Sequence, residues 1–423
     1  MGDYFPRCAP AQAGVDAARL LELCAELQKP RYGLHALLLL RGGKIFYESY
    51  AAPYQKGERH SLFSVSKSFT AVAILFAVQE GILSLEDRVI GFFPEKLPSP
   101  PCPNMAAMTI RHLLTMTPGL DAAPHDFKYP HLDDAINDFP YSYSNFSYDG
   151  RPDWVGDFLH RYVEHPPGQR FLYCSSCTYM LSAILKKATG QGLLEFLGSR
   201  LLEPLGMHEA AWQKCPSGIE VGGWGLSLCA ESLAKFGQFL LQEGRWEGRQ
   251  LLEEEWFDLA CTKQIETAGD AEGHVKEWAY GYGFQCWMCR TPGSFRADGA
   301  FGQFGVVLPD KDLFVILTTG TYQTQDELDG IFEEIVPTLT DSAQEASAAA
   351  DVLKERTGQL TIKAGALSEK IHHIAIIGSD YERSRHFYVD LLGFTVIREN
   401  HRKDKADCKI DLKCGEQEIE LFI

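Results

Sequence analysis

The chain has 423 residues, of which 45% are hydrophobic, so it is long enough to bury a large core and to form more than one domain. Its formal net charge of −17 argues against nucleic acid and anionic membranes as partners, because both are negatively charged. The N-terminus lacks the apolar segment of a signal peptide, and no apolar run is long enough to span a membrane. We therefore expect a cytoplasmic protein whose 12 cysteines are reduced.

The first predicted elements are a helix and a hairpin. Residues 15–28 have apolar side chains at helical spacing, and residues 34–40 and 45–50 are apolar runs separated by two glycines. An apolar helix follows directly. It ends at Gly81, and glycine is the residue that most readily adopts the left-handed conformation past a helix end.

This apolar helix opens with a pattern that suits nucleophilic catalysis. Ser64 and Lys67 are three residues apart, which places both side chains on one helical face. A serine hydroxyl becomes a nucleophile when a neighbouring lysine accepts its proton, provided that burial lowers the lysine pKa. Free N–H groups at the helix start would help to hold an oxyanion. Helices that merely begin with several serines show the same spacing, so further motifs must support the interpretation.

Residues 82–230 are predicted to be mostly helical with long loops, and residues 109–120 read as one of these helices. The stretch 121–165 is weakly periodic, and a long irregular segment is often functional, although it also suits a surface excursion. Tyr173 precedes a helix expected over 177–188. A tyrosine near a lysine ammonium can act as a base, whereas its more frequent use is packing.

The later part of the main body returns to strands. We expect helices at 248–262 and 326–339, and strands at 282–288, 302–308 and 313–319. A hairpin at the front, helices in the middle and antiparallel strands at the end predict an α/β (α+β) fold. In this fold helices flank an antiparallel sheet that a helical insertion interrupts.

A small polar segment divides the chain. Residues 341–368 are poor in core-forming side chains and suit a linker between a domain at 1–340 and a module at 369–423. The module has the order βαβββ, with strands expected at 371–377, 394–399, 409–413 and 418–423 and a helix at 380–392.

Over roughly residues 10–340 the chain resembles the serine β-lactamase-like family, which includes class C β-lactamases, DD-peptidases and related esterases and amide hydrolases. The resemblance is carried by three motifs in the family's order: Ser64-x-x-Lys67, Pro167-Gly168-x-x-Phe171-x-Tyr173-x-Ser175, and Ala297-Asp298-Gly299. Residues 222–228, which precede a predicted helix, also look like the family. Together these motifs are specific for the family but not for one substrate.

The resemblance implies acyl transfer. Ser64 would attack a carbonyl carbon while Lys67 and Tyr173 move protons. Ser175 would orient Lys67 or the substrate, and the main-chain N–H groups of Ser64 and Ala300 would hold the oxyanion. Water would then release the acyl group, and none of these steps needs a metal or another cofactor.

Two departures from the family pattern bear on the substrate. Ser175 stands where the family usually has asparagine, as in some esterase-like members. Ala297 stands where β-lactamases and DD-peptidases have a lysine or histidine near the substrate carboxylate, and Asp298 lies beside it. We therefore expect hydrolysis of a small ester or amide. The alternatives are β-lactamase or D-alanyl-D-alanine carboxypeptidase activity, and a catalytically silent binding protein.

The C-terminal module resembles one half of a glyoxalase-like (vicinal oxygen chelate) domain, through its His-His-Ile-Ala-Ile strand, its Phe-Tyr…Leu-Gly-Phe segment and its last strand. In that family a first-strand histidine and a last-strand glutamate bind a divalent metal, which by residue match would be His373 and Glu420. Two ligands make an incomplete site. We expect either a homodimer in which a second copy completes it, or a remnant without activity.

Overall fold

The computed structural model describes residues 4–27, 29, 32–121, 153–267, 277–321 and 324–339 of the main body, and 374–377, 395–402, 407–414 and 417–422 of the C-terminal module. The chain divides into two compact units that separate the C-terminal strands from the main body. None of the helices in these described ranges has both the length and the apolar character that crossing a membrane requires.

The main body is built on a six-stranded sheet in the order β2-β1-β11-β10-β9-β8, with every neighbouring pair antiparallel. Its strands are β1 (Leu34–Arg41), β2 (Lys44–Tyr50), β8 (Trp287–Met288), β9 (Phe295–Gly299), β10 (Gln303–Leu308) and β11 (Leu313–Thr319). The sheet confirms the predicted hairpin, and it joins the N-terminal strands to the late ones because β1 pairs with β11.

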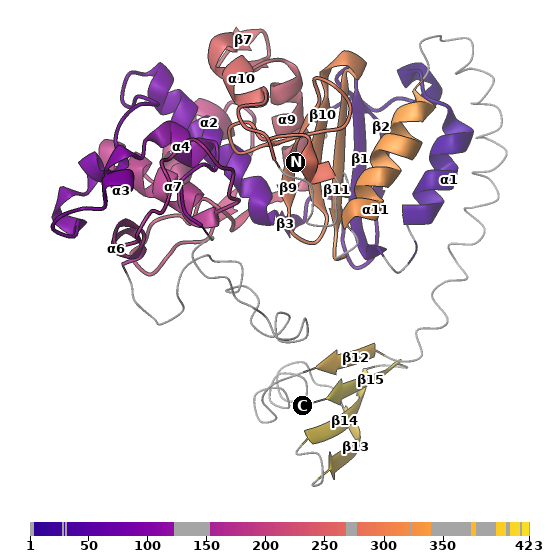
Figure 1. The fold of residues 1–423 in the computed structure, drawn as a ribbon. Helices are drawn as coiled ribbons and strands as arrows, with labels where there is room; N and C mark the ends of the chain where they lie inside the picture. The colour runs from indigo at the N-terminus through magenta and orange to yellow at the C-terminus, as the bar shows by residue number, and fades with distance from the viewer. Residues whose placement is uncertain are drawn as a thin grey trace. The chain divides into compact units, whose positions relative to one another are not determined.

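Helices cover both faces of this sheet (Figure 1). One face packs against α1 (Ala17–Leu27) and α11 (Thr324–Asp329), and the other packs against α9 (Ala230–Leu241). Each face of the sheet forms a hydrophobic core with its helices, and successive leucines of β1 alternate between them. Leu37 and Leu39 belong to the core with α1 and α11, and Leu38 belongs to the core with α9. A strand buried on both sides reads as a continuous apolar run, which is what the sequence has here.

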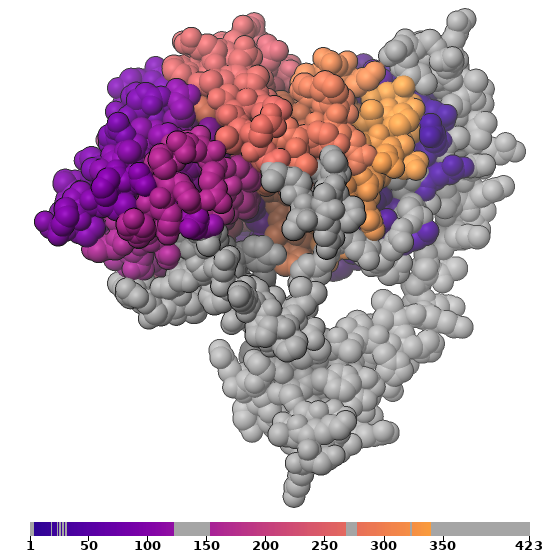
Figure 2. All heavy atoms as spheres, in the orientation of Figure 1, coloured from indigo at the N-terminus to yellow at the C-terminus, as the bar shows by residue number. Residues whose placement is uncertain are grey.

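The remaining helices lie beside the sheet and enclose α2 (Ser66–Gln79), whose side chains are buried from Ser66 to Ala77. An α-helix that is apolar all round belongs in a protein interior. In the space-filling view the atoms of this helical part lie directly against those of the sheet part (Figure 2). The surrounding helices are α3 (Pro103–Ala107), α4 (Ile110–Leu114), α6 (Trp154–Leu159), α7 (Ser175–Thr189), α8 (Leu193–Leu197) and α10 (Glu254–Cys261).

Several predicted boundaries are wrong. Ser64 lies not in α2 but in the 3₁₀ turn Phe63–Val65 that precedes it. The helix expected at 109–120 ends at Leu114, because Met116 adopts a left-handed φ of 56°. The helix expected at 177–188 begins earlier, at Ser175. The closing helix is confirmed, although it begins at Thr324 and continues after Asp329 as a π-helix (Gly330–Ile335).

The structure also contains strands that were not predicted. The third motif lies on β9, and a three-stranded sheet in the order β3-β5-β4 lies within and beside the region expected to be helical. Its strands are β3 (Arg59–Ser61), β5 (Leu226–Cys229) and β4 (Ala211–Trp212), and a further hairpin pairs β6 (Arg245–Trp246) with β7 (Arg249–Gln250). The strands of these two small sheets are too short to give a readable alternation.

The C-terminal module forms its own four-stranded sheet in the order β12-β15-β14-β13, of which only the β12–β15 pair is parallel. The strands are β12 (Ile374–Ile377), β13 (Thr395–Arg402), β14 (Asp407–Cys414) and β15 (Gln417–Phe422). The predicted helix and His373 lie outside the described residues, as does the side chain of Glu420. The metal site and the homodimer therefore stay predictions.

The close contact between α9 and the sheet requires a glycine at position 237, and this requirement can be tested. A Cβ atom added to Gly237 would lie 2.0 Å from two ring atoms of Phe314, which is 1% exposed on β11. Gly237→Ala gains about 1 kcal/mol in helix propensity. We nevertheless expect a net loss of about 1–3 kcal/mol of unfolding free energy from overpacking, measured by urea denaturation.

Gly91→Ala is the matched control, because a Cβ there has no heavy atom within 4 Å and the residue has no left-handed φ. We expect its denaturation midpoint to match that of the parent protein. An unchanged or higher midpoint for Gly237→Ala would contradict this account of the contact between α9 and the sheet.

Candidate active site

Ser64 is presented by a strained turn. Phe63, the residue before it, has a φ of 44°, which is unfavourable for a residue with a bulky side chain. The Ser66 hydroxyl holds the turn, donating to the Phe63 carbonyl at 2.6 Å and accepting the Leu226 N–H at 3.1 Å. The Ser66 hydroxyl therefore supports the turn, whereas the Ser64 hydroxyl is the one that contacts Lys67.

Lys67 lies one helical turn after Ser64 and is 1% exposed. Its Nζ donates to Ser64 Oγ at 2.8 Å, to Ser175 Oγ at 3.0 Å and to the Gly223 carbonyl at 2.7 Å. An ammonium group has three donors, and these three partners use all of them.

Burial lowers the pKa of Lys67 to about 7, although the charges of Cys174, Asp298 and Cys177 oppose the shift. Desolvation disfavours the charged form of an amine. Near neutral pH the amine can therefore give up its proton and act as a base towards the Ser64 hydroxyl, to which it is already hydrogen-bonded.

Tyr173 and Ser175 reach the site from the start of α7. Ser175 is its first residue, and Tyr173 stands on the segment before it, with its ring centroid 4.9 Å from Lys67 Nζ. The Tyr173 ring stacks on Trp287 at 5.4 Å and meets Tyr282 edge-on at 6.3 Å. The structure thus brings both residues of the second motif to Lys67, with Tyr173 held in an aromatic cluster.

The end of β9 lies against the Ser64 turn. A Cβ atom on Gly299 would lie 2.5 Å from the Leu62 carbonyl oxygen and 3.3 Å from Ser64 N, so only glycine allows this approach. Ala300 follows in the turn before β10. Phe301, with a φ of 63°, packs its ring edge-on against Phe63 at 5.3 Å. The segment that carries the Ala300 N–H therefore adjoins the Ser64 turn, as the predicted oxyanion pair requires.

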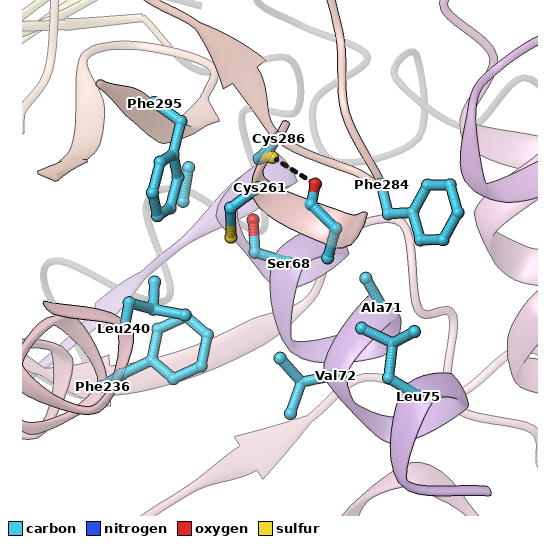
Figure 3. A pocket seen from close by; sticks show the side chains of 12 residues that line it. Ser68, Ala71, Val72, Leu75, Phe236, Leu240, Cys261, Phe284, Cys286 and Phe295 are labelled. Atoms are coloured by element: carbon cyan, nitrogen blue, oxygen red, sulfur yellow. Dashed lines mark hydrogen bonds between the residues drawn. The ribbon is translucent and has the colours of Figure 1, made fainter. Parts of the chain in front are cut away.

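Ala297 brings no charge to the site. Its side chain is 4% exposed and lines a small apolar pocket, together with one face of α2 that begins at Ser68. Figure 3 shows phenylalanine and leucine side chains and two cysteines around this pocket, with Cys286 donating to the Ala260 carbonyl. A substrate carboxylate would find no cation at this position.

Asp298 points to the other face of β9 from Ala297. Its Oδ2 accepts the Trp278 indole N–H at 2.9 Å and the Arg296 Nε–H at 3.0 Å. Burial raises the pKa of Asp298, and Arg296, Trp278 and Lys67 oppose that shift. The third motif of this chain thus has an acid at Asp298 and no charge at Ala297, the position where β-lactamases and DD-peptidases have a cation.

Two residues that help to build this region, Gly223 and Gln285, were not predicted. Residues 222–228 were expected only as part of the family resemblance, whereas the Gly223 carbonyl accepts a hydrogen bond from Lys67. Gln285, with a φ of 60°, donates to the Leu113 and Leu114 carbonyls and accepts the Thr178 hydroxyl. The paired glycines at 222 and 223 are the one sequence signal that points to the Gly223 contact. Nothing in the local sequence indicates the role of Gln285.

The lowered pKa of Lys67 generates a prediction about pH. The neutral amine is the base, so the rate at which a fluorophosphonate labels Ser64 should rise through about pH 7 and level off above it. Lys67→Arg should label at a negligible rate at every pH, because a guanidinium stays protonated. A wild-type rate that did not vary between about pH 5 and 9 would argue against Lys67 as the base.

Two family models match the chain. The Beta-lactamase model covers residues 28–334, and the Glyoxalase/Bleomycin resistance protein/Dioxygenase superfamily model covers residues 370–423. The C-terminal segment therefore carries a glyoxalase-like domain, as its motifs indicated.

Individual proteins give the same division. The chain is 25% identical over 329 residues to the 6-aminohexanoate-dimer hydrolase of Paenarthrobacter ureafaciens, which covers 75% of this chain and 82% of that protein. Its C-terminal part is 54% identical over 57 residues to the uncharacterized protein YwkD of Bacillus subtilis, spanning 13% of this chain and 44% of that one. The octameric penicillin-binding protein homologue of Pyrococcus abyssi has the same fold, with a TM-score of 0.58, 20% identity and coverage of 77% and 78%.

Proposed function

Because this chain belongs to the Beta-lactamase family over residues 28–334, we propose that it is a serine hydrolase that cleaves a small ester or amide through an acyl-enzyme on Ser64. One observation carries the proposal. The amine of Lys67 is buried, has a pKa lowered to about 7, and donates to the Ser64 hydroxyl at 2.8 Å.

The steps of the proposed reaction follow from these contacts. Ser64 Oγ attacks the substrate carbonyl as its proton passes to Lys67, and the resulting oxyanion lies between the N–H groups of Ser64 and Ala300. The tetrahedral intermediate collapses to an ester on Ser64 as Lys67 and Tyr173 return a proton to the leaving alcohol or amine. A water molecule then attacks the acyl group, and Lys67 takes and returns its proton in the same way.

Several features favour an ester or amide without a carboxylate over a β-lactam or a D-alanyl peptide. The last two carry a carboxylate, and Ala297 offers no cation to bind one, while Asp298 would repel it. The relative from P. ureafaciens is named as a hydrolase of the 6-aminohexanoate dimer. That name supports a small substrate but not the absence of a carboxylate, because 6-aminohexanoate is itself a carboxylate. A silent binding protein would have no need for a buried lysine on a serine hydroxyl, because burial of an amine is costly.

Variants of the three side chains test the proposal. Ser64→Ala should abolish turnover of p-nitrophenyl esters while leaving the fold intact. Lys67→Ala and Tyr173→Phe should each lower kcat/KM by about 10²–10⁴, the usual range for acid–base groups. Their effects should not add in the double variant, because both residues act on the same proton transfers.

Ser66→Ala is the informative control, since its hydroxyl supports the turn but does not reach Lys67. It should lower stability more than it lowers turnover. Full activity in Ser64→Ala, or additive losses from Lys67→Ala and Tyr173→Phe, would count against the proposed roles.

We also propose that the C-terminal module pairs with a second copy and that His373 and Glu420 of both chains then bind a divalent metal. The support is the open edges of its sheet, where β12 and β13 each pair on one side only among the described strands. Removing residues 341–423 should preserve ester turnover and convert a dimer into a monomer in sedimentation. A full-length chain that sediments as a monomer and holds no metal would rule this pairing out.

A further inference from the structure

Among the described residues, hydrogen bonds reach only one oxygen of the Asp298 carboxylate. Both of its hydrogen bonds, from Trp278 and from Arg296, go to Oδ2. No described residue donates to Oδ1, although the side chain keeps 12% of its surface exposed. A carboxylate oxygen that is near solvent and has no protein donor is ready to accept a hydrogen bond or an ion pair from a ligand.

Arg296 does not cancel this charge. Its guanidinium is fully buried and lies 3.8 Å from a carboxylate oxygen of Glu277, which is also fully buried, so one cation is shared between two anions. The surrounding ion-pair cluster sets two arginines against four carboxylates: Arg290 and Arg296 against Glu277, Asp298, Asp329 and Glu333. In the Arg296–Asp298 pair, Asp298 is the member with exposed surface, and the cluster as a whole is negative.

Aromatic rings hold the carboxylate in place and surround the reacting groups. The Trp278 indole donates to Asp298, and the Arg296 guanidinium carbon lies 5.3 Å from the Trp278 ring and 5.9 Å from the Trp287 ring. Trp287 in turn stacks on Tyr173, beside Lys67. Aromatic faces next to a carboxylate attract organic cations, above all substituted ammonium groups.

Asp298 is also close to the nucleophile. The next residue, Gly299, lies against Ser64 N, and the charges of Asp298 and Lys67 each shift the pKa of the other. A ligand cation at Oδ1 would therefore be part of the molecule whose carbonyl lies at Ser64. Burial raises the pKa of the Glu327 carboxyl group to about 8, which disfavours its charged form and weakens its competition for a cation.

We propose that Asp298 selects substrates with a positively charged ammonium group near the scissile ester or amide bond. This inference rests on the proposed hydrolase function and names the substrate class more narrowly. The acidic body of the chain would favour the approach of such cations, with a net charge of −17.

The test uses ester pairs of equal shape. Butyrylcholine is compared with its uncharged isostere, in which a tert-butyl carbon replaces the quaternary nitrogen, so that the charge lies on the alcohol side. The p-nitrophenyl ester of glycine betaine is compared with that of tert-butylacetic acid, so that the charge lies on the acyl side. For each pair the quantity is the ratio of kcat/KM for the charged ester to that for the neutral one.

In Asp298→Asn this ratio should fall by about tenfold to a hundredfold for at least one pair, the range expected when a charged partner is lost. Comparing variant with parent removes the intrinsic reactivity difference between the esters. Asp310→Asn is the matched control, because Asp310 is exposed in the β10–β11 turn, at the opposite end of β10 from Ala300. Its ratios should equal those of the parent.

A second readout needs no variant. The preference of the parent enzyme for the charged ester should decline as salt is added, because salt screens an ion pair that is open to solvent. Ratios that are unchanged in Asp298→Asn for both pairs, or that do not depend on salt, overturn the inference while leaving hydrolysis of the neutral esters as evidence for the proposed function. A protein that neither cleaves any of these esters nor reacts with a fluorophosphonate overturns the proposed function itself.

Discussion

The site depends on keeping one lysine amine out of water. Lys67 is buried, and its three hydrogen bonds end on three separate parts of the chain: the Ser64 turn, the start of α7 at Ser175, and the loop at Gly223. Each contact fixes one element relative to α2, so the same side chain that would activate the nucleophile also joins these segments. Desolvation lowers its pKa to about 7, which makes the neutral amine available near neutral pH.

Strained and close-packed backbone surrounds this lysine. Left-handed φ angles occur at Phe63, Met116, Gln285 and Phe301, none of which is a glycine. Phe63 precedes Ser64, and Phe301 follows the residue proposed to hold the oxyanion. Such conformations persist only where the surrounding packing enforces them, and here the enforcing elements are the large sheet and the buried helix α2. Rigid packing would keep the reacting groups aligned, which is a large part of the advantage of an intramolecular reaction.

Much of this arrangement could be predicted from the sequence at positions where the residue type and its spacing favour one local structure. The apolar runs on either side of two glycines predicted the β1–β2 hairpin, and the spacing of Ser64 and Lys67 predicted that they share a helical face; the structure contains the hairpin and a contact between the two side chains. Gly81 was expected to follow the helix end and has a left-handed φ of 70°. In each case a local rule and the tertiary structure agree.

Other features were not predictable because they arise only when distant segments meet. Gly223 contributes a carbonyl, which every residue has, so nothing in its side chain reveals that Lys67 binds there. Residues 295–299 form a strand that was not predicted. Its two charged residues, Arg296 and Asp298, pair with each other and with Trp278 and Glu277. Unlike the Gly223 contact, this strand had a local signal, because Phe295, Ala297 and Gly299 alternate with the two charged residues.

The most direct test of the central claim is to locate the acyl group during turnover. The protein would be quenched with acid while it hydrolyses a p-nitrophenyl ester, digested, and examined by tandem mass spectrometry. The account predicts an acyl group on Ser64 in the parent protein and none on Ser61, Ser66 or Ser68. Turnover without any acylated peptide, or an acyl group on one of those other serines, would contradict it.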